Sequence, residues 1–102
     1  MKIFSIIVTY NGMRWIEECL LSLINSTIPI SIIVVDNNSS DETVFFIKNN
    51  FKDVTVIQQS ENLGFGKANN IGIKRAYDDG ADYIFLLNQD AFIYNDTIQK
   101  MV

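Results

Sequence analysis

The stretch Tyr83-Ile84-Phe85-Leu86-Leu87-Asn88-Gln89-Asp90 joins an apolar strand to a short polar segment. Its first five residues are all apolar, which is typical of a parallel strand that helices cover on both faces. Such a strand predicts an α/β fold, in which ligands bind beyond the carboxyl ends of the strands. Asp90 lies at that place, where one carboxylate and substrate phosphates can together hold a divalent cation. An isolated Asp after a strand also commonly starts a turn. The residues at the other strand ends therefore have to distinguish a metal-binding role for Asp90 from a turn.

Composition restricts the class of protein. The chain has 102 residues, of which 48% are hydrophobic and 20% charged, and this predicts one globular domain. A net charge of −4 argues against binding to a nucleic-acid duplex, and the absence of histidine excludes histidine-based catalysis. Cys19 is the single cysteine, so we expect no disulfide framework and no thiolate metal site, but a buried, inert thiol. The apolar runs are short and no signal sequence is evident, which predicts a cytoplasmic protein, with the cytoplasmic face of a membrane as a further possible location.

Strands alternate with helices along the rest of the chain. The hydrophobic patterns predict strands at 3–9, 30–36, 54–58 and 82–87. Helices are predicted at 13–25, 41–50 and 64–77, with Ser40 as the cap of the second and Asn95 as the cap of a short last helix. Small residues recur every fourth position in the third helix, which lets its backbone approach a sheet closely; they are Gly64, Ala68, Gly72 and Ala76.

This alternation predicts a parallel sheet in a three-layer α/β fold with right-handed crossovers. A dinucleotide-binding fold would carry its glycine fingerprint after the first strand, but Thr9-Tyr10-Asn11-Gly12 stands there. The segment Gly64-Phe65-Gly66-Lys67 is not a P-loop, because Ala68 follows the lysine and the glycine spacing is wrong. A receiver-like domain would need an acidic pair after the first strand, which is also missing. None of these three α/β families therefore fits the sequence well.

Four segments at the predicted strand ends resemble the family 2 inverting glycosyltransferases with a GT-A fold, rhamnosyltransferase-like members among them. The segments are Ile6-Ile7-Val8-Thr9-Tyr10-Asn11, Ile33-Val34-Val35-Asp36-Asn37-Asn38-Ser39-Ser40-Asp41, Glu61-Asn62-Leu63-Gly64-Phe65-Gly66-Lys67-Ala68-Asn69-Asn70-Ile71-Gly72 and Leu86-Leu87-Asn88-Gln89-Asp90. The resemblance implies a Rossmann-like half of that fold, with the strands in the order third, second, first, fourth. It also implies a UDP- or dTDP-sugar donor, a saccharide or lipid-linked acceptor, and sugar transfer with inversion.

The resemblance also implies a set of nucleotide-sugar-binding residues. They are Thr9, Tyr10, Asn11, Asp36, Asn38, Asn62, Gly64, Lys67, Asn69, Asn88 and Asp90. In these roles Tyr10 forms an aromatic wall for the base and ribose, and Asp36 accepts the N3 hydrogen of uracil or thymine. Lys67 reaches a phosphate, and Asp90 binds Mn2+ or Mg2+, which bridges the donor diphosphate. Taken alone, Asp36 is equally compatible with a turn or a helix cap, and Lys67 with a solvated side chain.

The sequence departs from the family pattern in two places. Asn88 stands where many members have an acidic residue, which leaves Asp90 as the one carboxylate of that motif. The chain also ends at Val102, whereas the family places its acceptor pocket and catalytic base farther along. Residues 1–102 are therefore expected to form the nucleotide-sugar-binding portion of a glycosyltransferase domain, inactive alone, with no catalytic residue identified. The edge of the strand Tyr83 to Leu87 would then be open and would favour a homo-oligomer.

Two other functions were compared with this one. A non-catalytic nucleotide-sugar-binding or assembly module would keep the same binding residues. A sugar-1-phosphate nucleotidyltransferase would need a loop rich in glycine and arginine after the first strand, and that loop is missing.

Overall fold

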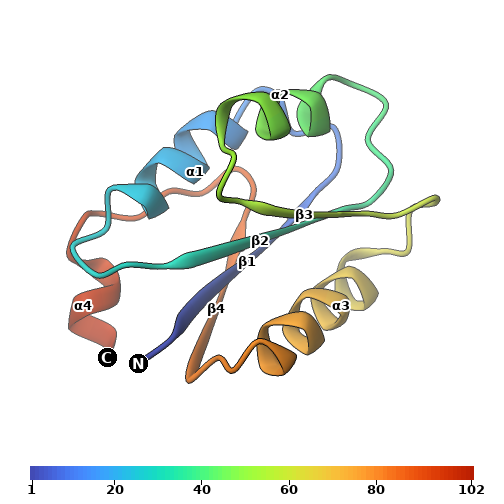
Figure 1. Ribbon diagram of the computed structural model, residues 1–102. Coiled ribbons are helices and arrows are strands. Elements are labelled where there is room, and N and C mark those ends of the chain that lie inside the picture. The colour runs from blue at the N-terminus through green and yellow to red at the C-terminus, as the bar shows by residue number, and fades with distance from the viewer.

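The computed structural model describes every residue from Met1 to Val102 (Figure 1). Its elements, in chain order, are β1 (Ile3–Thr9), α1 (Ile16–Ile24), β2 (Ser31–Asp36), α2 (Thr43–Asn50), β3 (Thr55–Gln58), α3 (Phe65–Asp78), β4 (Tyr83–Asn88) and α4 (Thr97–Met101). The four strands form one sheet in the order β3-β2-β1-β4, and each neighbouring pair is parallel. The predicted fold class and strand order are confirmed.

The helices cover the two faces of this sheet, α1 and α2 on one and α3 on the other (Figure 1). All seven residues of β1 are buried, because this strand lies inside the sheet between β2 and β4. Its side chains alternate between the faces: Ile7 packs in the core with Leu20 of α1, whereas Ile6 and Val8 pack with Ala68 of α3. β1 thus has a nearly continuous apolar sequence because it has two cores to fill.

Small residues bring α3 close to the sheet, as the sequence predicts. Ala68, Gly72 and Ala76 are buried, and a Cβ atom at Gly72 would lie only 2.5 Å from Cγ2 of Ile6. Gly64 is the exception, because it precedes the helix with φ of +85° and is exposed. Of the four small residues, only Ala68, Gly72 and Ala76 therefore contact the sheet.

The predicted strands agree with the observed ones to within one residue at each end, but the helix starts differ. Helix α1 begins at Ile16 because the chain first makes a tight turn, in which the carbonyl of Gly12 accepts hydrogen bonds from the Trp15 and Ile16 amides. Ser40 does not cap α2. Its amide bonds instead to Asn11 Oδ1, 2.8 Å away, and Glu42 occupies the N-cap position.

The last helix also begins one residue later than expected. Asp96 rather than Asn95 precedes α4, and the Asn95 carbonyl accepts a hydrogen bond from the Thr27 amide at 2.7 Å. No side-chain hydrogen bond caps the start of α4.

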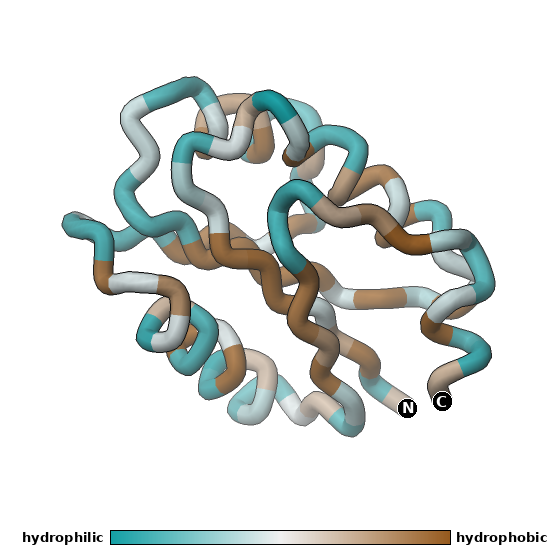
Figure 2. Tube along the Cα trace, turned by 180° about the vertical axis from the view of Figure 1, so that it is seen from behind, coloured by the Kyte–Doolittle hydropathy of each residue, from teal (hydrophilic) through white to brown (hydrophobic).

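Strand β4 is more exposed than its sequence predicts. Tyr83 is 43% and Leu86 52% exposed, although the all-apolar sequence indicates burial on both faces. The strand lies at one edge of the sheet, and α3 packs mainly over β1 and β2. Figure 2 shows β4 in front, apolar over its middle, with no further strand beyond it. The expectation of burial on both faces is therefore wrong for this strand.

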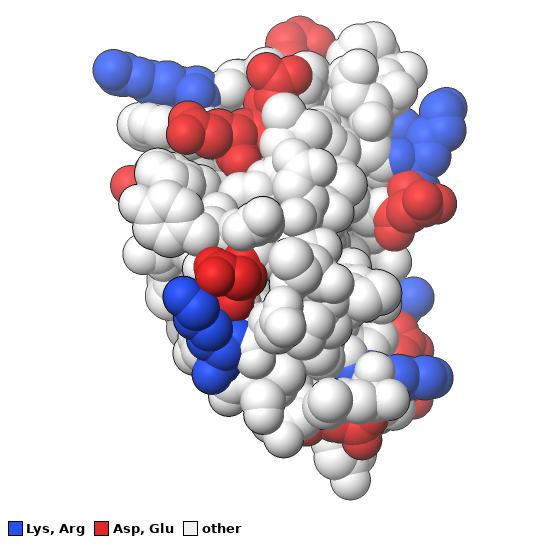
Figure 3. All heavy atoms as spheres, turned by 90° about the vertical axis from the view of Figure 1, so that its left-hand side faces the viewer, with Lys and Arg blue, Asp and Glu red and all other residues white.

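Charged side chains are dispersed over the surface that Figure 3 shows, where lysines and arginines stand singly among acidic residues. This face has no continuous basic stripe of the kind that duplex nucleic acids bind. None of the four helices combines the length and the apolar composition that a membrane crossing requires.

Candidate functional site

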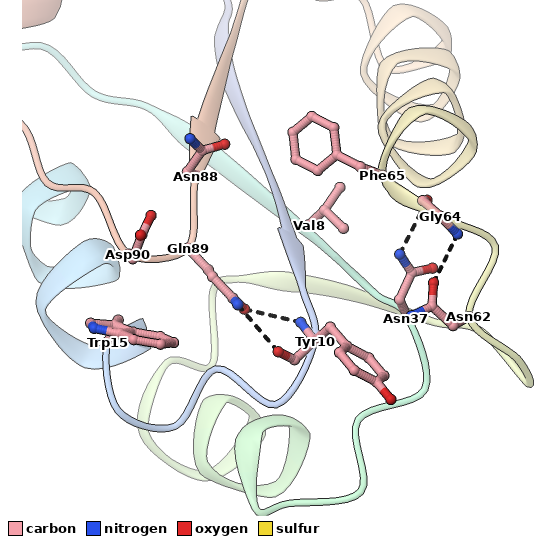
Figure 4. A pocket seen from close by; sticks show the side chains of 10 residues that line it. All are labelled: Val8, Tyr10, Trp15, Asn37, Asn62, Gly64, Phe65, Asn88, Gln89 and Asp90. Carbon is pink, nitrogen blue, oxygen red and sulfur yellow. Dashed lines mark hydrogen bonds between the residues drawn. The ribbon is translucent and has the colours of Figure 1, made fainter.

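A pocket of about 490 Å³ lies at the carboxyl ends of β1, β2 and β4, beside the loop that leads into α3 (Figure 4). Parallel α/β sheets bind ligands at this end of the strands, because the loops that follow the strands converge there. The residues that line the pocket are Val8, Tyr10, Trp15, Asn37, Asn62, Gly64, Phe65, Asn88, Gln89 and Asp90.

The structure brings together five of the residues predicted from the sequence. Tyr10, Asn62, Gly64, Asn88 and Asp90 all line this pocket, although they come from three different strand ends. The other predicted residues lie outside the lining, and they are Thr9, Asn11, Asp36, Asn38, Lys67 and Asn69.

Three aromatic side chains form walls of the pocket: Tyr10, Trp15 and Phe65 (Figure 4). Between 40% and 57% of each residue is exposed. An exposed aromatic face beside a polar cavity is a suitable surface for stacking a nucleobase or a sugar ring. The guanidinium of Arg14 lies 5.6 Å from the centre of the Trp15 ring, so a cation–π contact helps to hold this wall in place.

Asp36 is buried and bonded to its own protein rather than open to the pocket. Its Oδ1 accepts hydrogen bonds from the hydroxyls of Thr9 and Ser39, each at 2.6 Å, and its Oδ2 accepts one from the Ser39 amide at 2.9 Å. The residue has no exposed surface. In this structure the carboxylate fastens the end of β1 to the loop after β2.

The next residue, Asn37, presents its carboxamide at the pocket instead. Its Nδ2 donates to the Gly64 carbonyl and its Oδ1 accepts from the Leu63 amide, both at 3.2 Å (Figure 4). Asn62 Oδ1 accepts a further hydrogen bond from the Gly64 amide at 2.8 Å. A carboxamide has two donor hydrogens and two lone pairs, so these contacts leave one of each on Asn37 without a protein partner, in a residue that is only 3% exposed.

Asn11 does not line the pocket, but its hydrogen bonds connect two of the loops around it. Its amide donates to Ser39 Oγ at 2.9 Å, and its side-chain oxygen accepts hydrogen bonds from the amides of Ser40 and Asp41. Asn11 has φ of 49° and Asn38 has φ of 65°, left-handed values that asparagine tolerates better than most residues. Both asparagines therefore suit the sharp turns that follow β1 and β2.

Lys67 and Asn69 lie on the first turns of α3, away from the pocket lining. Lys67 is exposed, as a solvated lysine would be, whereas Asn69 is buried on the helix face that packs on the sheet.

The pocket contains oxygen ligands that suit a hard divalent cation. Asp90 supplies one exposed carboxylate and Asn88 one carboxamide, and no group of three or more His, Cys, Asp or Glu residues surrounds them. Mg2+ is often bound by one or two carboxylates, with water and phosphate oxygens at the other positions. The donor set therefore fits a cation held largely by a bound diphosphate.

The thiol of Cys19 lies beneath this part of the pocket. Its Sγ donates to the Asn88 carbonyl at 3.6 Å, and the side chain is fully buried. Burial, and secondly the negative charge of Asp90, raise the pKa of the thiol to about 12. The thiol is therefore protonated at neutral pH, which agrees with the inert cysteine that the sequence predicts.

Five residues of the lining were not among the predicted ones: Val8, Trp15, Asn37, Phe65 and Gln89. Asn37, Phe65 and Gln89 each lie beside a predicted residue within one of the four motifs, so the motifs indicated the right segments but not these individual residues. Trp15 lies outside those motifs, and its place at the pocket depends on the turn that precedes α1.

Sequence comparison identifies relatives along the whole chain. An uncharacterized glycosyltransferase of Haemophilus influenzae is 33% identical over 107 aligned positions, which cover 100% of this chain and 42% of that protein. The dTDP-rhamnosyl transferase RfbF of Shigella flexneri is 31% identical, over 98% of this chain and 33% of that protein. The chain thus spans less than half the length of these curated relatives.

Solved structures share the fold. Staphylococcus aureus TarS 1-349 in complex with UDP-GlcNAc superposes with a TM-score of 0.87 and 29% identity, over 99% of this chain and 30% of that one. The mannosyltransferase PcManGT of Pyrobaculum calidifontis, in complex with GDP-Man and Mn2+, superposes with a TM-score of 0.82 and 25% identity, over 95% of this chain and 30% of that one.

The family described as "Glycosyl transferase family 2" matches residues 5–102, nearly the whole chain. This match agrees with the four motifs at the strand ends and with the GT-A fold of the structural neighbours. The chain therefore belongs to glycosyl transferase family 2.

Proposed function

We propose that residues 1–102 bind the nucleotide-diphospho-sugar donor of a family 2 glycosyltransferase, which transfers the sugar with inversion to a saccharide or lipid-linked acceptor. The observation that carries this proposal is the pocket at the carboxyl ends of the strands, where aromatic walls and carboxamides face one carboxylate, Asp90. The relatives support a UDP- or dTDP-sugar as the donor, because one was solved with UDP-GlcNAc and another is a dTDP-rhamnosyl transferase.

The base and ribose of the donor are proposed to bind at the end of the pocket formed by Tyr10, Asn37 and Asn62. Tyr10 offers an aromatic face for stacking. Asn37 offers a donor and an acceptor, which together match the N3 hydrogen and a neighbouring carbonyl of uracil or thymine. Asp36 acts behind Asn37, because its hydrogen bonds to Thr9 and Ser39 fix the loop that carries the carboxamide.

The diphosphate is proposed to lie toward Asp90 and Asn88. A bound Mn2+ or Mg2+ supplies positive charge that stabilises the diphosphate leaving group. Asp90 would hold the cation with its exposed carboxylate, and Asn88 would contribute an oxygen or orient a phosphate. The structural neighbour solved with GDP-Man and Mn2+ supports a divalent cation in this fold.

These residues do not provide a general base. The pocket contains a single carboxylate, Asp90, and the chain has no histidine. A carboxylate that binds the cation cannot also accept the proton of the acceptor hydroxyl in an efficient way. We therefore propose that the base and the acceptor site depend on residues other than 1–102, and that these residues alone bind the donor without transferring its sugar.

Titration calorimetry tests the proposal. UDP or dTDP should bind more tightly than CDP, and manganese should strengthen the binding of UDP. Asp90→Ala should abolish the effect of manganese and leave the affinity for uridine nearly unchanged. Asp78→Ala is the matched control, because Asp78 is an exposed carboxylate near the far end of α3.

Two results would contradict these assignments. UDP binding that does not depend on manganese would leave Asp90 as a turn residue, and equal affinities for UDP and CDP would refute the recognition of the base. Tight binding by an intact protein that transfers no sugar to any acceptor would favour the non-catalytic binding module.

A further inference from the structure

The side chain of Gln89 continues the pairing between β1 and β4 beyond the end of the sheet. The last backbone pair of these strands is Val8 with Asn88. Past that pair, the Tyr10 amide donates to Gln89 Oε1 at 2.9 Å, and Gln89 Nε2 donates to the Tyr10 carbonyl at 3.2 Å. Figure 4 shows these two bonds between Gln89 and Tyr10, which both line the pocket. The carboxamide thus replaces the peptide group of a neighbouring strand.

Gly12 provides the space that this side chain occupies. A Cβ atom at position 12 would lie 2.3 Å from Gln89 Oε1 and 3.0 Å from its Cδ, far closer than van der Waals contact. Gly12 is not needed for its backbone conformation, because the positive-φ glycines are Gly64 and Gly80. The most direct physical reason for glycine at position 12 is the position of Gln89.

The backbone of Gly12 is itself held in place. Its amide donates to Thr43 Oγ1 at 3.0 Å, and its carbonyl accepts from the amides of Trp15 and Ile16 at 3.0 and 2.9 Å. A side chain at position 12 would therefore displace the flexible end of Gln89 more readily than it would move this backbone.

We propose that Gln89 is a positioning residue that sets the separation between the Tyr10 wall and the Asp90 carboxylate, and that residue 12 is glycine to leave room for it. Gln89 directly precedes Asp90 in the chain, so a fixed Gln89 limits where Asp90 can lie. Tyr10 and Asp90 are at different parts of the same pocket. As far as it concerns ligand binding, this inference rests on the proposed donor site.

The chemistry of the side chain explains why glutamine suits this position. A carboxamide both donates and accepts, as the Tyr10 peptide group requires. A glutamate could accept from the Tyr10 amide, but it could not donate to the carbonyl, and it would add a second negative charge beside Asp90. Glutamate would also be a new metal ligand, so alanine is the better test substitution.

Hydrogen exchange of the Tyr10 amide tests the contact without any ligand. In the unmodified chain this amide should be protected, because it donates to Gln89. Gln89→Ala and Gly12→Ala should each accelerate its exchange by a similar factor, and the double variant should exchange no faster than either. Gly66→Ala is the matched control, because a Cβ at Gly66 meets nothing within 4 Å. An unprotected Tyr10 amide, or one that neither substitution changes, would refute the contact.

Calorimetry with UDP and manganese tests the positioning role. Gln89→Ala and Gly12→Ala should each weaken the binding of UDP with manganese by roughly tenfold, as expected for lost hydrogen bonds, and the double variant should show no additive loss. The affinity for uridine should change little, because the base and ribose are proposed to bind at the other end of the pocket from Asp90. A purely structural role would weaken uridine and UDP binding equally and would overturn the proposal.

The two experiments separate this inference from the proposed function. If the unmodified chain does not bind UDP, the donor site and the positioning role both fail, while the exchange measurement still decides the contact between Gln89 and Tyr10. If the unmodified chain binds UDP and both variants bind it equally well, the positioning role alone is refuted.

Discussion

Asn37 and Gln89 hold the pocket together in the same way. Each carboxamide pairs with one backbone donor and one backbone acceptor of another loop, Asn37 with Leu63 and Gly64, and Gln89 with Tyr10. A glutamine or asparagine is the natural side chain for this purpose, since it presents a donor and an acceptor side by side. At the scale of single residues, the pocket is therefore shaped by groups that bind the protein as well as by groups that face a ligand.

Asp36 accepts three hydrogen bonds from Thr9 and Ser39 and is fully buried. Asp36→Asn should lower the free energy of unfolding by about 1.5–3 kcal/mol, because a charged acceptor of three hydrogen bonds is replaced by a group that can accept fewer. Urea unfolding measures the change. Asp53→Asn is the control, an exposed position at which the change should stay within about 0.5 kcal/mol. A loss of that small size for Asp36→Asn would refute a structural role for the carboxylate.

Ser5 is buried in β1, and its hydroxyl has no hydrogen-bond partner. Ser5→Ala should therefore raise the free energy of unfolding by about 1 kcal/mol, because an unpaired polar group no longer loses its hydration. Thr9→Val is the contrasting variant in the same strand, since the Thr9 hydroxyl donates to Asp36. It should destabilise the protein, and a loss of stability in Ser5→Ala would mean that its hydroxyl has a partner after all.

At the scale of elements, helix α3 depends on its small residues for contact with the sheet. Gly72→Ala would place a Cβ atom 2.5 Å from Ile6 and 3.2 Å from Val35, so it should cost about 1–3 kcal/mol of stability. Gly66→Ala, in the same helix but in open space, should instead be neutral or stabilise by up to about 1 kcal/mol. Thermal unfolding compares the two, and equal effects would show that α3 can shift on the sheet without cost.

The start of α2 should contribute to the loss of stability in acid. Desolvation would raise the pKa of Asp41, but hydrogen bonds from the hydroxyl and amide of Thr43 and from the amide of Met13 outweigh it and lower the pKa below the ordinary 3.8. The pKa of Asp41 is lower in the folded state than in the unfolded state. The ionised carboxylate therefore stabilises the folded state at pH values above the ordinary pKa, and this stabilisation is lost as the pH falls through the lowered pKa.

Asp41→Asn should therefore weaken the dependence of unfolding free energy on pH between about pH 5 and pH 3. Urea titrations across this range measure the slope. Glu42→Gln is the control, because the neighbouring Glu42 is also exposed and its carboxylate accepts no hydrogen bond. A slope that is unchanged by Asp41→Asn would contradict the assignment.

For the molecule as a whole, the open edge of β4 should control association. The strand ends the sheet, and Tyr83 and Leu86 expose apolar surface beside unpaired backbone groups. We expect the 102-residue chain to form a dimer or larger oligomer through this edge, because an exposed apolar strand is a template for pairing with another strand.

Light scattering over a range of concentrations tests this association. Leu86→Lys should give a monomer, because a charge on an edge strand opposes pairing. Phe45→Lys is the control, since Phe45 is even more exposed than Leu86, at 66% against 52%, but lies on α2, which packs against β3 rather than β4. A monomeric unmodified chain at high concentration would refute the prediction.

Local patterns in the sequence determined the elements, because short hydrophobic periods distinguish strands from helices. The strand order and the roles of the motifs that carry Tyr10, Asn62 and Asp90 were implied by the family resemblance. The polar residues that follow the strands mark the ligand-binding edge of a parallel sheet.

Only the tertiary structure decided which of these polar residues face the pocket. Asp36 and Asn37 are neighbours in the chain, yet one is buried against Thr9 and the other lines the cavity, because contacts from β1 and from the loop before α3 orient them. The need for glycine at position 12 likewise arises from Gln89, which is distant in sequence. Both features depend on which distant segments pack together, so they cannot be predicted from the local hydrophobic pattern of the sequence.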